Sequence, residues 1–305
     1  MMKPLGGMIG SLLVLAAGCA GGDGSPTPDA PAGVPAGAEE EAAPGQLPLV
    51  IAPVSGEFDA STGTDEVDLA RIAELRAAVE ARADDPEAQR ALAIALHGAR
   101  RRDEAIPHFE KLVELQPDPR SLLDLALAYN SISRLAEAEA TYARLLELSP
   151  GNAIALHNLG AIAAKRGEFE KAISLYRQAL ATDPVYLLAQ YHLANALQRA
   201  GRYQEAYDAF AAVIDLEPAN AAETALYDDA LYRAASLDIT MGAHERAAGM
   251  LAELLRANPD HGSAHYAYGQ VLLQLGRIEE ARREFEEHVR VLAEQHPQAP
   301  VAMGD

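Results

Sequence analysis

The chain has 305 residues and a formal net charge of −20, because 45 Asp and Glu outnumber 25 Lys and Arg. This charge repels nucleic acid, so we expect no role in binding DNA or RNA. The single cysteine, Cys19, excludes an intramolecular disulfide and a cysteine-rich metal site. Hydrophobic residues make up 49% of the chain and aromatic residues only 5%, so the apolar content is mainly aliphatic, which favours closely packed helices.

The first nineteen residues have the layout of an export signal. Lys3 precedes an apolar run from Leu5 to Ala17 that is too short to cross a bilayer as a helix, and small residues stand directly before Cys19. The segment resembles the signal peptide and lipobox of bacterial lipoproteins, although Ala16 replaces the commoner leucine. The resemblance implies removal of residues 1–18 and acylation of Cys19. The alternative is an ordinary signal peptide with an incidental cysteine.

Residues 19–64 have a different composition from the rest of the chain. From Ala20 to Thr64, 24 of 45 residues are Ala, Gly or Pro, and no Lys or Arg is present. Such a segment cannot bury enough apolar area to offset its ordering entropy, so we expect a disordered tether. Its one apolar stretch, Leu47–Val54, could lie as a strip along the folded domain or dock into its groove.

From about Asp65 the apolar residues recur at spacings of three and four, which predicts amphipathic helices. Prolines then punctuate the sequence with a period of 34 and one insertion of seven residues; they are Pro117, Pro150, Pro184, Pro218 and Pro259. The insertion lies within Ala219–Tyr227, which contains no Gly or Pro. We expect it to lengthen the first helix of the fifth unit by about two turns.

Other positions recur with the same period. A small residue appears as Ala105, Ala138, Ala172, Ala206, Ala247 and Ala281, and four places later a large one as Phe109, Tyr142, Tyr176, Phe210, Leu251 and Phe285. A turn glycine recurs as Gly167, Gly201, Gly242 and Gly276, with Arg100 and Ser133 in its place in the first two units. This pattern resembles the tetratricopeptide repeat.

The resemblance implies an all-α, right-handed superhelical solenoid of six helix pairs over residues 86–296, with a disordered N-terminal tether. We expect residues 65–85 to form a helix that covers the first edge, through Ile72, Leu75 and Val79, and residues 297–305 to be a tail. From Glu279 to Gln295, nine of seventeen residues are charged, which predicts a last helix that faces water.

The sequence contains no phosphate loop, nucleophile elbow or paired zinc motif, so we predict a protein that is not an enzyme and that has no cofactor or metal. His261 and His265 have a ligand-like spacing of four. No third ligand lies near them in the sequence, however, and two ligands hold zinc poorly.

The predicted binding site is the groove lined by the first helices. His157, Tyr191, Tyr232 and Tyr266 occupy one equivalent position, and Asn195, Ser236 and Gln270 lie one turn further on; we predict that these seven residues bind a peptide. The alternative is that the rings fill gaps between successive first helices. Some family members grip a C-terminal carboxylate with basic residues there, but only Arg90 is basic at that position in this chain.

The sequence therefore predicts a lipid-anchored scaffold that binds a protein or peptide segment in the bacterial cell envelope. An assembly factor resembling the lipoprotein pilotins of type IV pili is the alternative. Because Ala20 rather than Asp follows Cys19, the sorting rule of enteric bacteria favours the outer membrane, facing the periplasm.

Overall fold

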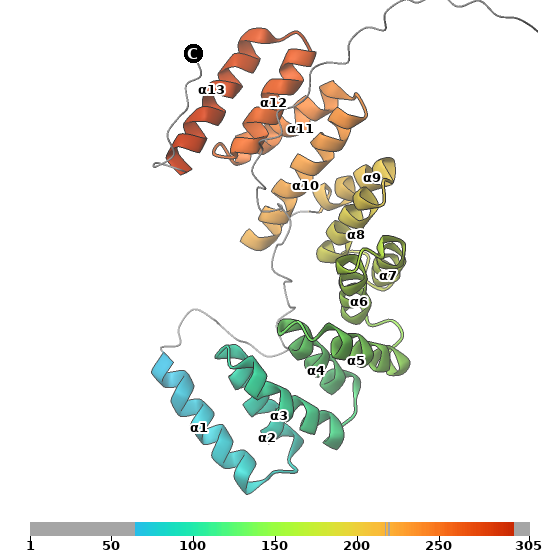
Figure 1. Cartoon of the computed structure of the whole chain (residues 1–305), viewed down its shortest axis with the longest axis vertical. Coiled ribbons are helices and arrows are strands. Elements are labelled where there is room, and N and C mark those ends of the chain that lie inside the picture. Colours follow the sequence, from blue (N-terminus) through green and yellow to red (C-terminus); the bar gives the residue numbers. More distant parts are fainter. Residues whose placement is uncertain (1–64, 217, 219, 296–305) are drawn as a thin grey trace, which may run out of the picture. The chain divides into compact units, whose positions relative to one another are not determined.

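The computed structural model describes residues 65–216, 218 and 220–295, and these residues form thirteen α-helices with no β-strand (Figure 1). The predicted signal peptide (1–18), the acylated Cys19, the tether (19–64) with its Leu47–Val54 stretch, and the tail (297–305) lie outside the described residues. No helix in the described part is long and apolar enough to cross a membrane.

Helix α1 (Asp65–Ala81) precedes six consecutive helix pairs. The first helices are α2 (Pro86–Gly98), α4 (Pro119–Ser131), α6 (Ala153–Lys165), α8 (Leu187–Arg199), α10 (Ala221–Thr240) and α12 (Gly262–Gln274). The second helices are α3 (Arg102–Leu115), α5 (Leu135–Leu148), α7 (Phe169–Thr182), α9 (Tyr203–Ile214), α11 (His244–Ala257) and α13 (Ile278–Gln295). Each helix packs against the next along the chain, which confirms the predicted all-α class of repeated helix pairs.

Several first helices begin at a residue that caps their free backbone amides. The side chains of Asp85, Asp118, Asn152 and Asn220 accept hydrogen bonds from the first turn. In α2 and α4 a proline follows the cap, where its missing N–H costs nothing. These caps explain why the helices start where the repeat predicts.

All six first helices end in the same turn. The turn position has a φ between 61° and 78° in every repeat, and its residues are Arg100, Ser133, Gly167, Gly201, Gly242 and Gly276. The following N–H then donates to a carbonyl of the last helical turn, as in the 2.9 Å bond from Arg101 N to Leu96 O. This is the Schellman geometry, which favours glycine. Arg100 and Ser133 therefore adopt the left-handed conformation without being glycine.

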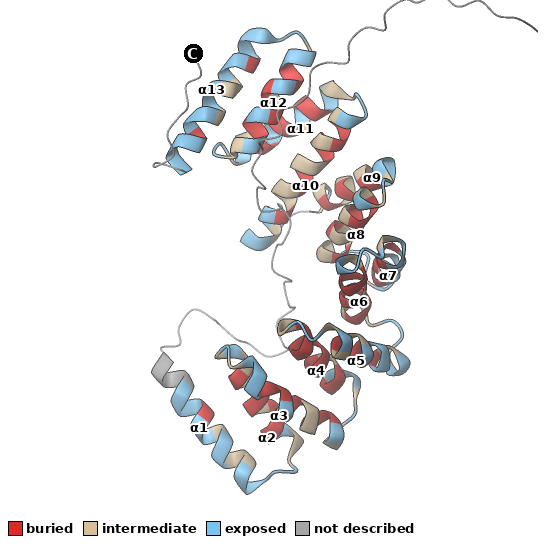
Figure 2. Cartoon of the chain, viewed as in Figure 1, coloured by how far each residue is buried: buried red, intermediate tan, exposed pale blue. Residues whose placement is uncertain are grey.

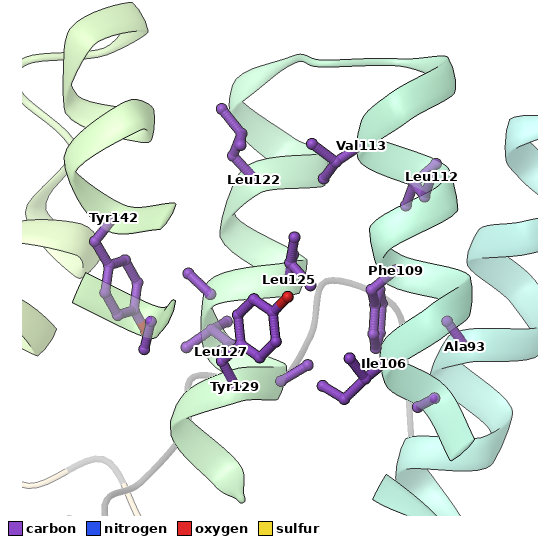
Figure 3. Close-up of a cluster of buried hydrophobic side chains, with 14 of the residues drawn as sticks. Ala93, Ile106, Phe109, Leu112, Val113, Leu122, Leu125, Leu127, Tyr129 and Tyr142 are labelled. Carbon is purple, nitrogen blue, oxygen red and sulfur yellow. The ribbon is translucent and has the colours of Figure 1, made fainter. Parts of the chain in front are cut away.

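The two helices of a pair cross at the recurring small residue. All six of these alanines are fully buried, and so are the large residues four places later in the first five repeats. Gly160 shows how little room the crossing leaves, since an added Cβ would lie 2.7 Å from Cε1 of Tyr176. Figure 3 shows the N-terminal part of this core, where Phe109 packs close to Ala93 and Ile106.

The structure has two departures from the regular repeat, and its first helix, α1, ends at Ala81 and not at residue 85, where we expected it to end. Helix α10 has 20 residues, whereas the other first helices have 13, so the insertion lengthens it by seven. Helix α1 covers the first repeat, because Ile72 is buried in the first core cluster and Leu75 and Val79 pack against it.

Helix α13 is less polar on its outer side than its nine charged residues predict. Ile278, Val289 and Leu292 are 65%, 53% and 42% exposed. The prediction of a water-facing helix therefore missed an apolar stripe on it.

Candidate functional site

The seven predicted groove residues differ in exposure along the chain. His157 and Tyr191 are each only 2% exposed. Asn195, Tyr232 and Ser236 are half-buried, whereas Gln270 is exposed and Tyr266 is 47% exposed. The accessible part of the predicted site therefore belongs to α8, α10 and α12.

His157 belongs to a group of buried and half-buried rings contributed by α6, α7 and the start of α8. Its ring centroid lies 5.6 Å from that of Tyr176, 5.1 Å from Tyr186 and 5.2 Å from His192. Burial lowers the pKa of His157 to about 3 and that of His192 to about 4, so both imidazoles are neutral at neutral pH. His157 thus packs between neighbouring first helices, as the alternative interpretation of the ladder describes.

Tyr191 links α8 to α10. Its hydroxyl donates a 2.6 Å hydrogen bond to Oδ2 of Asp229, and Nε of Arg233 donates to the same oxygen. Burial, reinforced by the Asp229 carboxylate, raises the pKa of Tyr191 to about 12, which keeps the phenol protonated as a donor. In this position Tyr191 stabilises the contact between the two helices.

The accessible residues are held mainly by contacts within their own helices. The Tyr232 ring lies 5.4 Å from the His261 ring, and the Ser236 hydroxyl donates to the carbonyl of Tyr232 at 2.8 Å. The amide of Asn195 donates to the carbonyl of Tyr191 at 3.0 Å. We call the five accessible residues the tyrosine face; they are Asn195, Tyr232, Ser236, Tyr266 and Gln270.

Tyr266 is the most accessible aromatic side chain of the tyrosine face. Its ring centroid lies 5.8 Å from that of Phe285 and 5.3 Å from that of His288, both on α13. These contacts fix the ring while nearly half of its surface stays open. A fixed, open tyrosine offers apolar area and a polar tip to a ligand at low entropic cost.

Sequence reasoning missed a buried ion pair between the first two repeats. Nη1 of Arg90 bonds to Oδ2 of Asp124 at 2.5 Å, and its Nη2 donates to the Ser121 hydroxyl at 2.9 Å. Arg90 and Asp124 are 34 residues apart, one repeat length, so opposite charges at that separation were the available signal. Because its guanidinium is occupied, Arg90 is not placed to grip a ligand carboxylate.

The histidine pair considered for metal binding is used in packing. His265 contacts Oε2 of Glu284 at 2.7 Å through Nδ1 and the carbonyl of Pro259 at 2.8 Å through Nε2. His261 caps α12 by accepting the N–H of Ala264 on Nδ1. Among the residues that the structure describes, no group of three or more His, Cys, Asp or Glu could hold a metal ion.

One model of the tetratricopeptide repeat family matches residues 71–118, 90–153 and 232–300, and a second model of this repeat matches residues 163–226. Together they span more than half of the chain, which therefore belongs to the tetratricopeptide repeat family. Its fold is a scaffold of a kind that typically mediates protein interactions and not catalysis. No curated protein matches the chain.

Solved structures with the same fold include MamA, which is 21% identical with a TM-score of 0.51 over 57% of this chain and 97% of that chain. YrrB, a TPR protein with an unusual peptide-binding site, is 22% identical with a TM-score of 0.51, over 63% of this chain and 96% of its own. The structure of Pseudomonas aeruginosa pilF is 15% identical with a TM-score of 0.56, over 70% of this chain and 93% of its own. At these identities the likeness concerns the fold alone.

Proposed function

We propose that this protein is a lipid-anchored scaffold of the bacterial cell envelope that binds a protein or peptide segment on its tyrosine face. The observation that carries the proposal is the exposure of Tyr266 and Gln270 on α12, together with the half-buried Tyr232 and Ser236 on the preceding first helix α10, which contacts α12. The peptide-binding site of YrrB, which has the same fold, supports the same use of this one.

The chemistry of the tyrosine face suits an extended peptide. Its amide and hydroxyl groups can donate to and accept from a peptide backbone, and its two rings can cover apolar side chains. The net charge of −20 disfavours a strongly acidic segment and favours a neutral or basic one.

A paired substitution tests the tyrosine face. Tyr232→Ala with Tyr266→Ala should reduce crosslinked capture of the partner from native envelope at least about tenfold, as expected for the loss of two aromatic anchors. The matched control is Tyr203→Ala, which removes an exposed tyrosine from the second helix α9. Undiminished capture by the double variant would place the binding surface elsewhere.

The buried tyrosine provides a second comparison. Tyr191→Ala should lower the melting temperature, because it removes the buried link to Asp229, and it should lower it more than Tyr266→Ala alone, whose ring is nearly half exposed. The captured proteins also bear on the biological role. Components of a single envelope machine would favour the assembly-factor alternative over a general scaffold.

The proposed anchor is tested separately. The wild-type protein should incorporate a fatty-acid probe and enter the detergent phase, whereas Cys19→Ser should do neither. Equal labelling of both proteins would refute acylation at this residue. Membrane fractionation then distinguishes the outer membrane, which Ala20 favours, from the inner membrane.

A further inference from the structure

Helix α13 is open where the other second helices are covered. The residues equivalent to Phe285 in the first five repeats are fully buried, and those equivalent to Val289 are buried or partly buried. In each case the following first helix packs against the second helix that carries these residues. No described helix follows α13, and Figure 2 shows most of its surface as exposed.

The open face has the residue spacing of a helix-pairing seam. Ile278, Arg282, Phe285, Val289 and Leu292 follow one another at intervals of four, three, four and three residues. This spacing keeps one stripe of a helix facing a partner helix. A mainly apolar hollow of about 510 Å³ lies on this face. It is lined by Leu273 of α12 and by Ile278, Arg282, Phe285, Glu286 and Val289 of α13.

We propose that a second copy of this chain covers this face, with α13 of each copy packed antiparallel against α13 of the other about a two-fold axis. In the other repeats a helix packs on the equivalent face. Helix α13 of a second copy carries an apolar stripe and can supply such a helix. An isologous contact uses the same patch twice, so one open face on each copy is sufficient.

The charges of the stripe are self-complementary. The only charged residues that line the hollow are Arg282 and Glu286, which are highly exposed and form an ion pair with each other at 3.0 Å along α13. A two-fold axis between Arg282 and Phe285 sets Ile278 of one copy opposite Val289 of the other. It also brings Arg282 within one residue of the level of Glu286 in the other copy, so the two intrahelical ion pairs can exchange partners across the contact. Two like-charged residues would have repelled each other in this arrangement.

The contact is small, and this determines its strength. A helix of 18 residues is about 27 Å long. A pair of such helices falls at the low end of specific interfaces in buried area, so the dimer should dissociate in the micromolar range.

The salt dependence distinguishes a second copy from a basic partner. Since each copy carries a charge of −20, added salt should screen the repulsion and strengthen the dimer. A basic partner on the same face would be weakened by salt.

Sedimentation of the full chain with Cys19→Ser tests the proposal across the micromolar range at low and high salt. We expect reversible dimers that salt strengthens and that Ile278→Glu with Val289→Glu weakens at least about tenfold. The control is Val185→Glu, which changes an exposed valine outside the helices. Monomers under all these conditions, or dimers unaffected by the double substitution, would overturn the proposal.

Crosslinking tests the geometry independently of the stability of those variants. In the Cys19→Ser chain, which has no other cysteine, Ile278→Cys mixed with Val289→Cys should form disulfide-linked dimers. Each variant alone should form far fewer. Equal crosslinking in all three samples would rule out the antiparallel pairing, and none of these substitutions alters the tyrosine face, so capture of the proposed partner is assessed separately.

Discussion

At the residue scale, the turn that ends each first helix sets the backbone preference of single residues against the conformation that the repeat requires. Four repeats place glycine at the turn position, whereas Arg100 and Ser133 hold φ values of 61° and 62° there. A residue with a Cβ pays roughly 1–2 kcal/mol in this conformation. The repeat geometry therefore outweighs the preference of these two residues.

Ser133→Gly should stabilise the protein, because glycine relieves this strain. Part of the gain is offset by the greater freedom of glycine in the unfolded chain, which leaves a net gain of about 0.5–1 kcal/mol. Thermal unfolding should then shift upward by about 1–4 °C. The control is Ser149→Gly, where φ is −143° and no strain is relieved, so that variant should be neutral or less stable. Equal shifts for both variants would contradict the explanation.

At the element scale, the contact between α6 and α8 depends on two neutral imidazoles. Burial lowers the pKa values of His157 and His192 from 6.5 to about 3 and about 4. Below about pH 6.5 the unfolded chain takes up protons at these residues that the folded protein does not. The free energy of unfolding should therefore decrease as the pH falls from about 6.5 to about 4, by up to about 1.4 kcal/mol per pH unit for each imidazole.

Denaturant unfolding of the wild type and of His157→Gln with His192→Gln measures this contribution. The carboxylates are common to both proteins, so the difference between the two curves isolates the imidazoles. We expect the variant to be less stable at neutral pH but to lose less stability between about pH 6.5 and pH 4. Parallel curves over this interval would show that the two histidines do not titrate as the structure indicates.

The sequence predicted elements better than contacts between elements. The 34-residue period located the helix pairs, the turn position and the longer α10, because these follow from spacing within one repeat. It did not distinguish the buried His157 and Tyr191 from the exposed Tyr266, although all three share one repeat position. Their exposure depends on neighbouring residues such as Asp229 and Tyr186, which belong to the next repeat. In the same way, counting charges on α13 concealed the apolar stripe.

At the scale of the whole molecule, the core is a series of neighbouring clusters. The first extends from Ile72 to Ile162, the second from Ala163 to Leu237, and the third from Leu231 to Val271. Helices pack mainly against their neighbours along the chain. The stability of such a protein is approximately a sum of repeat and neighbour terms, so a local perturbation should fade with distance along the chain.

Ala206→Leu tests this expectation. Ala206 is fully buried where α8 and α9 cross, so the larger side chain should overpack the second cluster and cost about 1–3 kcal/mol. Hydrogen exchange should accelerate in α8, α9 and α10 and remain unchanged in α2, α3 and α4. The control is Ala181→Leu, which adds the same atoms at an exposed position of α7 and should change exchange little. Uniform acceleration along the whole chain would instead show that the repeats unfold as a single cooperative unit, and no acceleration around α9 would contradict the packing at the crossing.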